Sequence, residues 1–266
     1  MLTSQPVITL TTDFGGRDGF VGAMKGVILS INPDARIVDL SHGIPRQDVF
    51  AGAMVMRNAC PYYPPGTVHV VVVDPGVGSD RRAIVAETTD AYYVLPDNGL
   101  ITLVDQLTPV RAAYSIENMG FCLPEISRTF HGRDIFAPVA AHLSRGLSPE
   151  QVGPPLESFA ELDLPTPSVS HNLVRGSIVY ADVYGNLFTN IGPAQISPHS
   201  KSWRLELNGK SVTGFCEYYS SVKEKLPLMI FGSSGFLEIA VNGGNALEYF
   251  GANVGDTFSL QHIDKS

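Results

Sequence analysis

Two aspartates stand directly after predicted β-strands, and each is followed by glycines. Asp13 follows the β-rich run 7–12, and Asp74 follows the run 67–73, which ends in four consecutive valines. In an open parallel sheet, ligands bind beyond the carboxyl ends of the strands, so we expect both carboxylates to face one cleft. A single aspartate in this position is as often a turn-capping residue, but two together favour a functional site.

Basic side chains that could act together with Asp74 occur later in the sequence. Arg81 and Arg82 are close enough in sequence for a turn to bring a guanidinium back onto the carboxylate, although an arginine pair on a solvated loop is the ordinary alternative. His131 lies next to a glycine, which permits close approach of a ligand, and just before a helix whose N-cap we expect to be Asp134. These residues are candidates for acid–base chemistry.

A metal centre is a competing interpretation of the same residues, because carboxylates and imidazole are common metal ligands. Its ligands would come from Asp13, Asp74, Asp97, His131 and Asp134. No HxH, HxxxH or CxxC spacing supports such a centre, so we expect no bound metal. The chain also contains neither GxGxxG nor GxxxxGK[ST], which argues against a site for nucleotide phosphates.

Three loops in the second half carry groups that could bind a nucleoside. Asp182, Asn186 and Phe188 place a carboxylate, an amide and an aromatic ring in one turn, on which a purine could stack. Ser233 and Gly243 lie in two further Gly-rich turns. Three ordinary β-turns are the competing interpretation.

The first half must position Asp13, Asp74 and His131 through an α/β unit, because strand and helix signals alternate there. Strands are predicted over 7–12, 36–40, 67–73, 82–87 and 92–95, and helices over 20–31, 47–59 and 134–144. The initial βαβαβ order implies a mostly parallel sheet, in which the run 67–73 is buried on both faces.

Composition changes after Gly146. We predict an α/β N-terminal domain over 1–150, a Pro-rich linker over 151–172 and a small all-β, barrel-like C-terminal domain over 173–266. Strands are expected there at 177–183, 203–207, 228–231, 237–241 and 257–261, with no convincing helix.

The composition of the 266 residues is that of a globular protein, with 44% hydrophobic and 17% charged residues. A formal net charge of −8 gives no global attraction for nucleic acid or anionic lipid, so we expect neither partner. Cys60, Cys122 and Cys216 are widely spaced and are expected to be reduced, buried thiols. No targeting or membrane-spanning segment is recognisable, which predicts a soluble cytoplasmic protein.

Six motifs, in order and spread across both predicted domains, closely resemble the S-adenosylmethionine hydroxide adenosyltransferase family, the water-using relatives of the fluorinase and chlorinase. The motifs are LTTDFG, VVVDPGVGSDRR, LPDNGL, TFHGRDIFAP, DVYGNLFTNI and SSGFLEIAVNGGNA. The resemblance implies an α/β domain, a β-barrel domain and a homotrimer with active sites between neighbouring subunits. It also implies hydrolysis of S-adenosylmethionine at ribose C5′ to adenosine and L-methionine, without a cofactor.

Carried over residue by residue, the resemblance places the catalytic groups on Asp74, Arg81 and His131, with Arg82 as the alternative arginine. Asp13 matches the carboxylate that binds the ribose hydroxyls. The remaining matches are Asp182 and Ser233 around the methionine moiety, and Asn186, Phe188 and Gly243 at the adenine site.

Other functions compete with hydrolysis. A halogenase of the same family is disfavoured because a carboxylate at Asp74 would repel a halide by several kcal/mol at about 4 Å in a semi-buried site. Water has the opposite need, since a carboxylate or imidazole can accept its proton and a guanidinium can stabilise the hydroxide. Whether Asp74 or His131 takes the proton stays open. A nucleoside-binding protein without turnover and a metal-dependent hydrolase are the remaining alternatives.

Overall fold

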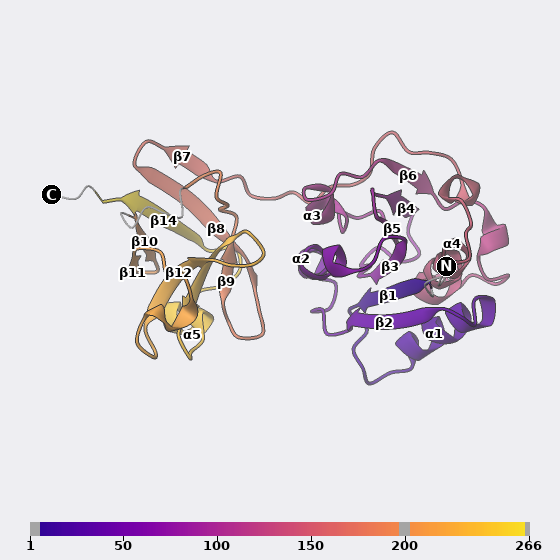
Figure 1. Cartoon of the computed structure of the whole chain (residues 1–266), viewed down its shortest axis with the longest axis horizontal. Helices are drawn as coiled ribbons and strands as arrows, with labels where there is room; N and C mark the ends of the chain where they lie inside the picture. The colour runs from indigo at the N-terminus through magenta and orange to yellow at the C-terminus, as the bar shows by residue number, and fades with distance from the viewer. Residues whose placement is uncertain (1–5, 197–202, 264–266) are drawn as a thin grey trace. The chain divides into compact units, whose positions relative to one another are not determined.

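The computed structural model describes residues 6–196 and 203–263, and the chain divides into two compact units, Met1–Leu162 and Asp163–Ser266 (Figure 1). The change of unit falls inside the segment 151–172 that composition marks as a linker. Part of that segment packs on the first unit, where the Ala160 N–H donates to Asp97 (2.7 Å) and the Leu162 N–H donates to Thr102 (2.9 Å). Its last residues form a strand of the second unit.

The first unit is built on a six-stranded sheet in the order β2-β1-β3-β5-β4-β6. Its strands are β1 (Val7–Thr12), β2 (Arg36–Ser41), β3 (Thr67–Val72), β4 (Ala83–Glu87), β5 (Ala91–Pro96) and β6 (Ala112–Ser115). Strands β2, β1, β3 and β5 pair in parallel, while β4 is antiparallel to both β5 and β6. The predicted mostly parallel sheet is confirmed.

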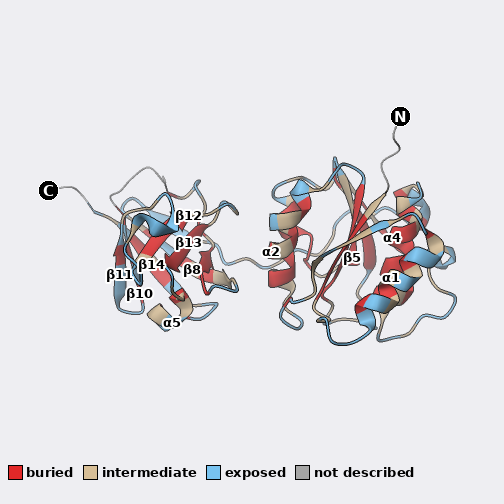
Figure 2. Cartoon of the chain, turned by 60° about the horizontal axis from the view of Figure 1, so that its bottom comes forward, coloured by how far each residue is buried: buried red, intermediate tan, exposed pale blue. Residues whose placement is uncertain are grey.

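Helices cover both faces of this sheet, with α1 and α4 on one face and α2 and α3 on the other (Figures 1 and 2). They are α1 (Phe20–Ile31), α2 (Val49–Ala59), α3 (Thr102–Asp105) and α4 (Ala137–Ser144), with 3₁₀ turns at Cys60–Tyr62, Met119–Phe121 and Pro149–Val152. Because the sheet is covered on both sides, all six residues of β3 are buried, as the valine run predicts.

Two helix starts differ from expectation. Helix α2 begins at Val49 rather than Gln47, because the Asp48 carboxylate caps it by accepting from the Ala51 N–H (2.9 Å). Asp134 is not the N-cap of the next helix. It is fully buried inside a π-helical turn, Gly132–Phe136, and its carboxylate accepts from the Ser127 N–H (2.8 Å) in the preceding loop. The helical turn therefore starts before the aspartate.

The second unit is an antiparallel sheet in the order β11-β10-β14-β8-β9-β13-β12, with β7 beside β8. Contacts between the terminal strands β11 and β12 bring the sheet close to a closed barrel, which confirms the predicted all-β, barrel-like domain. The strands are β7 (Ser168–Ser170), β8 (Leu173–Ala181), β9 (Leu187–Thr189), β10 (Trp203–Leu207), β11 (Lys210–Thr213), β12 (Pro227–Phe231), β13 (Leu237–Val241) and β14 (Thr257–His262).

The expectation of no helix in this unit is wrong. A five-residue helix, α5 (Ala246–Phe250), starts at the Asn245 cap and ends at Gly251 in the left-handed region, and Tyr219–Ser221 forms a 3₁₀ turn. Helix α5 is too short to show an apolar period, and the glycines before it resemble a turn.

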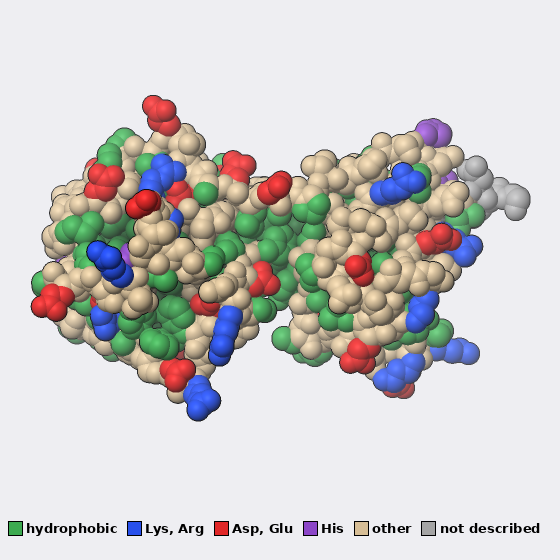
Figure 3. All heavy atoms as spheres, turned by 180° about the vertical axis from the view of Figure 1, so that it is seen from behind, with side chains coloured by type: hydrophobic (Ala, Val, Ile, Leu, Met, Phe, Trp, Pro, Cys, Tyr) green, Lys and Arg blue, Asp and Glu red, His purple; other side chains and the backbone are tan. Residues whose placement is uncertain are grey.

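On the face drawn in Figure 3, basic and acidic side chains are interspersed. Among residues 6–196 and 203–263, no helix combines the length and apolarity needed to span a membrane. The start of the chain, on which the expectation of no targeting segment partly rests, includes residues 1–5, which lie outside the described residues.

One polar side chain is fully buried in the middle of β3. His69 Nδ1 lies 2.7 Å from the Thr9 hydroxyl on β1, and its ring stacks on Tyr93 with centroids 5.0 Å apart. Burial lowers the pKa of His69 to about 4. The imidazole is therefore neutral in the folded protein near pH 7.

This depressed pKa predicts acid sensitivity. In the unfolded chain the His69 side chain binds a proton near pH 6.5. As the pH falls from about 6.5 to about 4, the contribution of His69 therefore lowers the free energy of unfolding by about 3 kcal/mol. Urea unfolding across this range measures the slope, and we expect His69→Asn, which does not titrate there, to flatten it. An imidazole that titrates near 6.5 in the folded wild type, followed by NMR, would contradict the prediction.

Candidate active site

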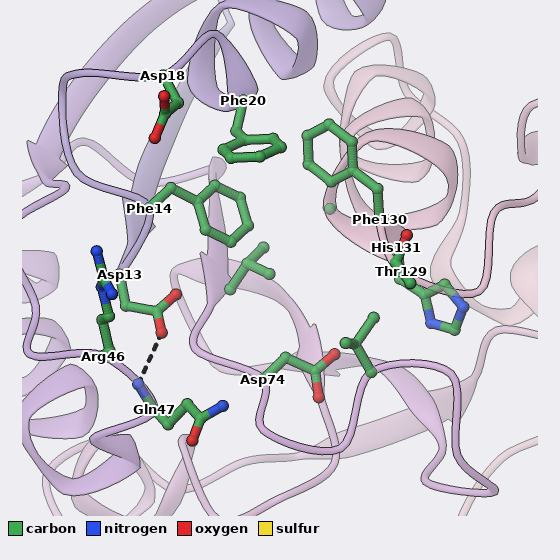
Figure 4. A pocket seen from close by; sticks show the side chains of 13 residues that line it. Asp13, Phe14, Asp18, Phe20, Arg46, Gln47, Asp74, Thr129, Phe130 and His131 are labelled. Atoms are coloured by element: carbon green, nitrogen blue, oxygen red, sulfur yellow. Dashed lines mark hydrogen bonds between the residues drawn. The ribbon is translucent and has the colours of Figure 1, made fainter.

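The carboxyl ends of β1 and β3 meet at one edge of the sheet, because these strands are parallel neighbours. Asp13 and Asp74 lie just beyond them and both line a cavity of about 310 Å³ (Figure 4). The expectation that both aspartates face one cleft is confirmed. The cavity lining also carries Asp18 and Arg46, so carboxylates outnumber cations there.

Arg81 joins Asp74 and His131 into one cluster. The turn after β3 brings its guanidinium back onto the carboxylate, with Nε 3.0 Å from each oxygen and Nη2 also donating to Oδ2. The same Nη2 lies 2.7 Å from His131 Nδ1. The side chains of Asp74 and Arg81 are only 4% and 11% exposed, so this is a largely desolvated ion pair.

Arg82 points elsewhere. Its Nε donates to Asp97 Oδ2 (2.7 Å) and its Nη2 to the Ser158 carbonyl (3.0 Å). Of the two adjacent arginines, Arg81 is therefore the one that contacts Asp74 and His131.

The protonation state of His131 follows from its contact with Arg81. Because a guanidinium only donates hydrogen bonds, Nδ1 must accept, and the proton of the neutral ring sits on Nε2. Burial, and after it the positive charge of Arg81, lowers the pKa of His131. The ring is a neutral hydrogen-bonding group at the cavity wall.

Asp13 is held by a residue that the sequence analysis does not single out. The Gln47 N–H donates to Asp13 Oδ2 (2.8 Å), the bond drawn in Figure 4. Gln47 has φ of 64°, a left-handed conformation that is unusual for a residue with a side chain and often found at functional sites. No local sequence signal predicts this conformation at a glutamine.

Three phenylalanines form an aromatic wall on one side of the cavity (Figure 4). Phe14, Phe20 and Phe130 contact one another with ring centroids 5.3 to 5.8 Å apart. Phe20, the first residue of α1, is 47% exposed although it is part of this wall. Apolar rings beside carboxylates suit a ligand with both a hydrophobic surface and a positive charge.

The second unit contains a pocket of its own, of about 750 Å³, lined by Asp182, Asn186 and Gly243 among others. The Asp182 carboxylate accepts from the Tyr184 N–H (2.9 Å) and from both the backbone and the side-chain amide of Asn186 (2.9 and 3.0 Å). These bonds close the turn between β8 and β9. Asp182 therefore stabilises the loop as well as lining the pocket.

Phe188 and Ser233 are not among the residues lining that pocket. Phe188 is buried on β9 opposite Glu238 of β13. Ser233 lies in the exposed turn between β12 and β13. The structure thus brings Asp182, Asn186 and Gly243 together, and leaves Phe188 and Ser233 outside the pocket lining.

A buried acid near this pocket escapes the sequence analysis. Glu238 is 3% exposed and accepts from the hydroxyl of Tyr219 (2.8 Å), which lines the pocket. Burial raises the pKa of Glu238. The signal that could have found it is a single acidic residue inside the otherwise apolar run 237–241, where a charge is costly unless it has a partner.

Within the described part of the chain, no group of three or more His, Cys, Asp or Glu side chains is arranged to hold a metal ion. Asp97 and Asp134, the remaining members of the alternative metal centre, are paired with Arg82 and Arg133.

Comparison with known proteins identifies relatives along most of the chain. Residues 8–153 match the SAM hydroxide adenosyltransferase N-terminal domain, and residues 176–259 match the C-terminal domain of the same family. An (R)-S-adenosyl-L-methionine hydrolase of Salinispora tropica is 38% identical over 94% of this chain and 96% of its own. A solved structure of an uncharacterized conserved protein from Thermotoga maritima superposes with a TM-score of 0.89 at 38% identity, covering 96% of this chain and 100% of the other.

Halogenating relatives are more distant. A fluorinase of an Actinoplanes species is 30% identical over 76% of this chain and 77% of its own. The two domain matches, and the 38% identity to a hydrolase over 94% of this chain, agree with the motifs and with the two-unit architecture. The chain belongs to the SAM hydroxide adenosyltransferase family.

Proposed function

We propose that this protein hydrolyses S-adenosylmethionine, with water or hydroxide attacking ribose C5′ and releasing adenosine and L-methionine. The observation that carries the proposal is the Asp74–Arg81–His131 cluster beside the cavity that also holds Asp13. Membership of the family and the identity to curated hydrolases supply the substrate.

The bond changes need no redox partner. The oxygen of water bonds to C5′ as the C5′–S bond breaks, and the bonding electron pair returns to sulfur. The sulfonium thereby becomes the neutral thioether of methionine, and the attacking water must lose a proton. A site that aligns the oxygen, C5′ and sulfur while limiting bulk water lowers the barrier to this displacement.

Asp74 is the proton acceptor that the geometry favours. His131 Nδ1 already accepts from Arg81 and its Nε2 carries the ring proton, so neither nitrogen is free to take another. Asp74 lines the cavity, and its carboxylate oxygens can each accept more than one hydrogen bond. The proton passes from water to Asp74 and then to solvent.

Arg81 has an electrostatic role. Its guanidinium stays charged, so it cannot be the base, but it stabilises hydroxide as charge develops on the oxygen. The contacts with Asp74 and His131 fix its orientation before substrate binds. His131 is thus a group that holds Arg81 rather than one that exchanges protons.

The charges of the cavity favour water over a halide. Asp13, Asp18 and Asp74 outnumber Arg46 in the lining, so the cavity attracts a sulfonium more readily than a halide nucleophile. This supports hydrolysis over halogenation.

The other residue roles are proposals taken from the family pattern. Asp13 binds the ribose hydroxyls, Asp182 and Ser233 contact the methionine moiety, and Asn186, Phe188 and Gly243 form the adenine site. The last five residues belong to the second unit, whereas Asp74 and Arg81 belong to the first. We propose a homotrimer in which one subunit supplies the first set and a neighbour supplies the second. The exposed apolar tip at Val183 (92%) and Tyr184 (74%), beside Asn186, supports burial against a partner.

We also propose that the reaction uses neither metal nor cofactor, because the positive charge of Arg81 against Asp74 and His131 disfavours a metal cation beside them. The cytoplasm is the proposed location, supported by the thiols of Cys60 and Cys122, which form no disulfide. Burial raises the pKa of Cys60 to about 12 and that of Cys122 to about 11, which keeps both as unreactive thiols.

Mass spectrometry of the products formed in ¹⁸O-labelled water, with chloride and EDTA present, tests the reaction. We expect labelled adenosine together with methionine, at a rate that EDTA does not change. Formation of 5′-chloro-5′-deoxyadenosine would place the protein among the halogenases. Loss of activity with EDTA would support a metal, and tight binding without any product would support a non-catalytic role.

Replacing the adjacent arginines separates their roles. Arg81→Ala should lower kcat by roughly 10² to 10⁴, because it removes the charge that stabilises hydroxide. Arg82→Ala is the matched control and should leave kcat within about threefold, since Arg82 pairs with Asp97. Wild-type turnover in a folded Arg81→Ala protein would remove the proposed role.

Mixed assemblies test the shared site. Asp74→Asn and Asn186→Ala should each be nearly inactive alone. If one site draws on two copies, co-expression of the two variants should restore about one quarter of the sites, those made from the intact unit of each copy. A mixed trimer that stays inactive, or full activity in a demonstrated monomer, would contradict the proposed arrangement.

A further inference from the structure

The turn that carries Asp13 is fastened to the loop after β2. The Gly15 N–H donates to the carbonyl of His42 (2.8 Å), and His42 Nδ1 lies 2.9 Å from the Thr12 hydroxyl. Thr12 is fully buried and immediately precedes Asp13. Together with the Gln47 N–H bond to Asp13, this loop holds the turn at three points.

The hydrogen atoms of this contact can be assigned. The Phe14 N–H donates to the Thr12 oxygen (3.2 Å), so the Thr12 hydroxyl is free to donate its own hydrogen to His42 Nδ1. His42 then carries its proton on Nε2, which lies 3.0 Å from Asp39 Oδ1. This contact is within ion-pair distance, but Nε2 has no hydrogen-bond partner of suitable geometry among the described residues.

The far side of the histidine is anchored as well. Asp39 Oδ2 accepts from Lys25 Nζ of helix α1 (2.6 Å). Burial acts to raise the pKa of Asp39, but its interactions with Lys25 and His42 together outweigh burial and lower the pKa, so Asp39 stays a carboxylate. A continuous chain of polar contacts thus runs from α1 through Asp39 and His42 to the backbone beside Asp13.

A backbone bond from Gly15 also joins the two loops, so the side-chain contacts are additional to it. The added side-chain contacts restrict rotation at Thr12, the residue whose backbone sets the direction of Asp13. Hydrogen bonds from residues behind a binding group can hold that group to within a fraction of an ångström of its working position.

We propose that His42 is a positioning residue that, through Thr12, orients the Asp13 carboxylate toward the ribose hydroxyl groups of the substrate. This inference rests on the proposed role of Asp13. His42 touches no substrate atom itself, so its effect is on ribose recognition and not on the attack at C5′.

The chain offers a matched control on the same strand. Thr9 is also fully buried on β1, and its hydroxyl lies 2.7 Å from Nδ1 of another histidine, His69. Thr12→Val and Thr9→Val therefore each remove a hydroxyl that contacts a histidine Nδ1, and Thr12→Val also removes the acceptor of the Phe14 N–H. Only Thr12 adjoins Asp13.

The experiment compares the dissociation constants of adenosine and 2′,3′-dideoxyadenosine by calorimetry on the full-length protein. Wild type and Thr9→Val should prefer adenosine by tenfold or more, the size expected of hydrogen bonds to a carboxylate. Asp13→Asn should bring the ratio close to one, and Thr12→Val should lower it at least about threefold. A loss of general stability would weaken both ligands equally and leave the ratio unchanged.

Variants at His42 provide a second test if Thr12→Val does not fold. His42→Ala should lower the ratio, and His42→Asn should recover part of it, because its amide oxygen can replace Nδ1 as the acceptor for Thr12. A wild-type ratio in Thr12→Val or His42→Ala, with a reduced ratio in Asp13→Asn, would overturn this inference while leaving the proposed function intact. No preference for adenosine in wild type would refute the role of Asp13 and the inference together, and no binding of adenosine at all would count against the proposed function.

Discussion

The Arg81–Asp74 ion pair is the interaction on which the rest of the active site depends. Removing two charges from water is costly, and the cost is offset only where the geometry supplies several hydrogen bonds. Here the guanidinium meets both oxygens of Asp74 and also His131 Nδ1. This one arrangement determines the tautomer of His131, leaves Asp74 lining the cavity, and presents a fixed positive charge beside it. The chemistry proposed for the protein follows from these consequences.

The backbone conformation between Asp74 and Arg81 allows the ion pair to form. The turn from Asp74 to Arg81 reverses through Gly78, whose φ is 78° and where a Cβ would lie 2.2 Å from the Arg128 carbonyl oxygen. Only glycine fits there, because both the conformation and the close approach exclude a side chain. The close approach of Gly78 to Arg128 also places the segment before His131 against the turn that follows Asp74. Gly78 therefore lies between the two segments that carry the partners of Arg81.

Relatives of this chain carry the names of (R)-S-adenosyl-L-methionine hydrolases and, at lower identity, of fluorinases. The parallel sheet supplies a cavity at its carboxyl edge, and the charges that line it support the proposed use of water. An acidic lining with a buried guanidinium accepts a cationic substrate and water. Asp13 and Asp74 both contribute to this acidic lining.

The sequence alone determined the family, the parallel sheet, the barrel-like second unit and the position of Asp13 and Asp74 at one edge of that sheet. These features depend on hydrophobic periodicity and on short sequence motifs. The sequence left Arg81 and Arg82 as alternatives and misplaced the start of the helix at Asp134. Only the tertiary structure decided these points, since adjacent arginines differ in nothing but the partners that folding brings to them, Asp74 and His131 for one and Asp97 for the other. The tertiary structure also revealed the roles of Gln47 and His42. Their contacts join loops that lie far apart in sequence, and no local sequence pattern marks these two residues.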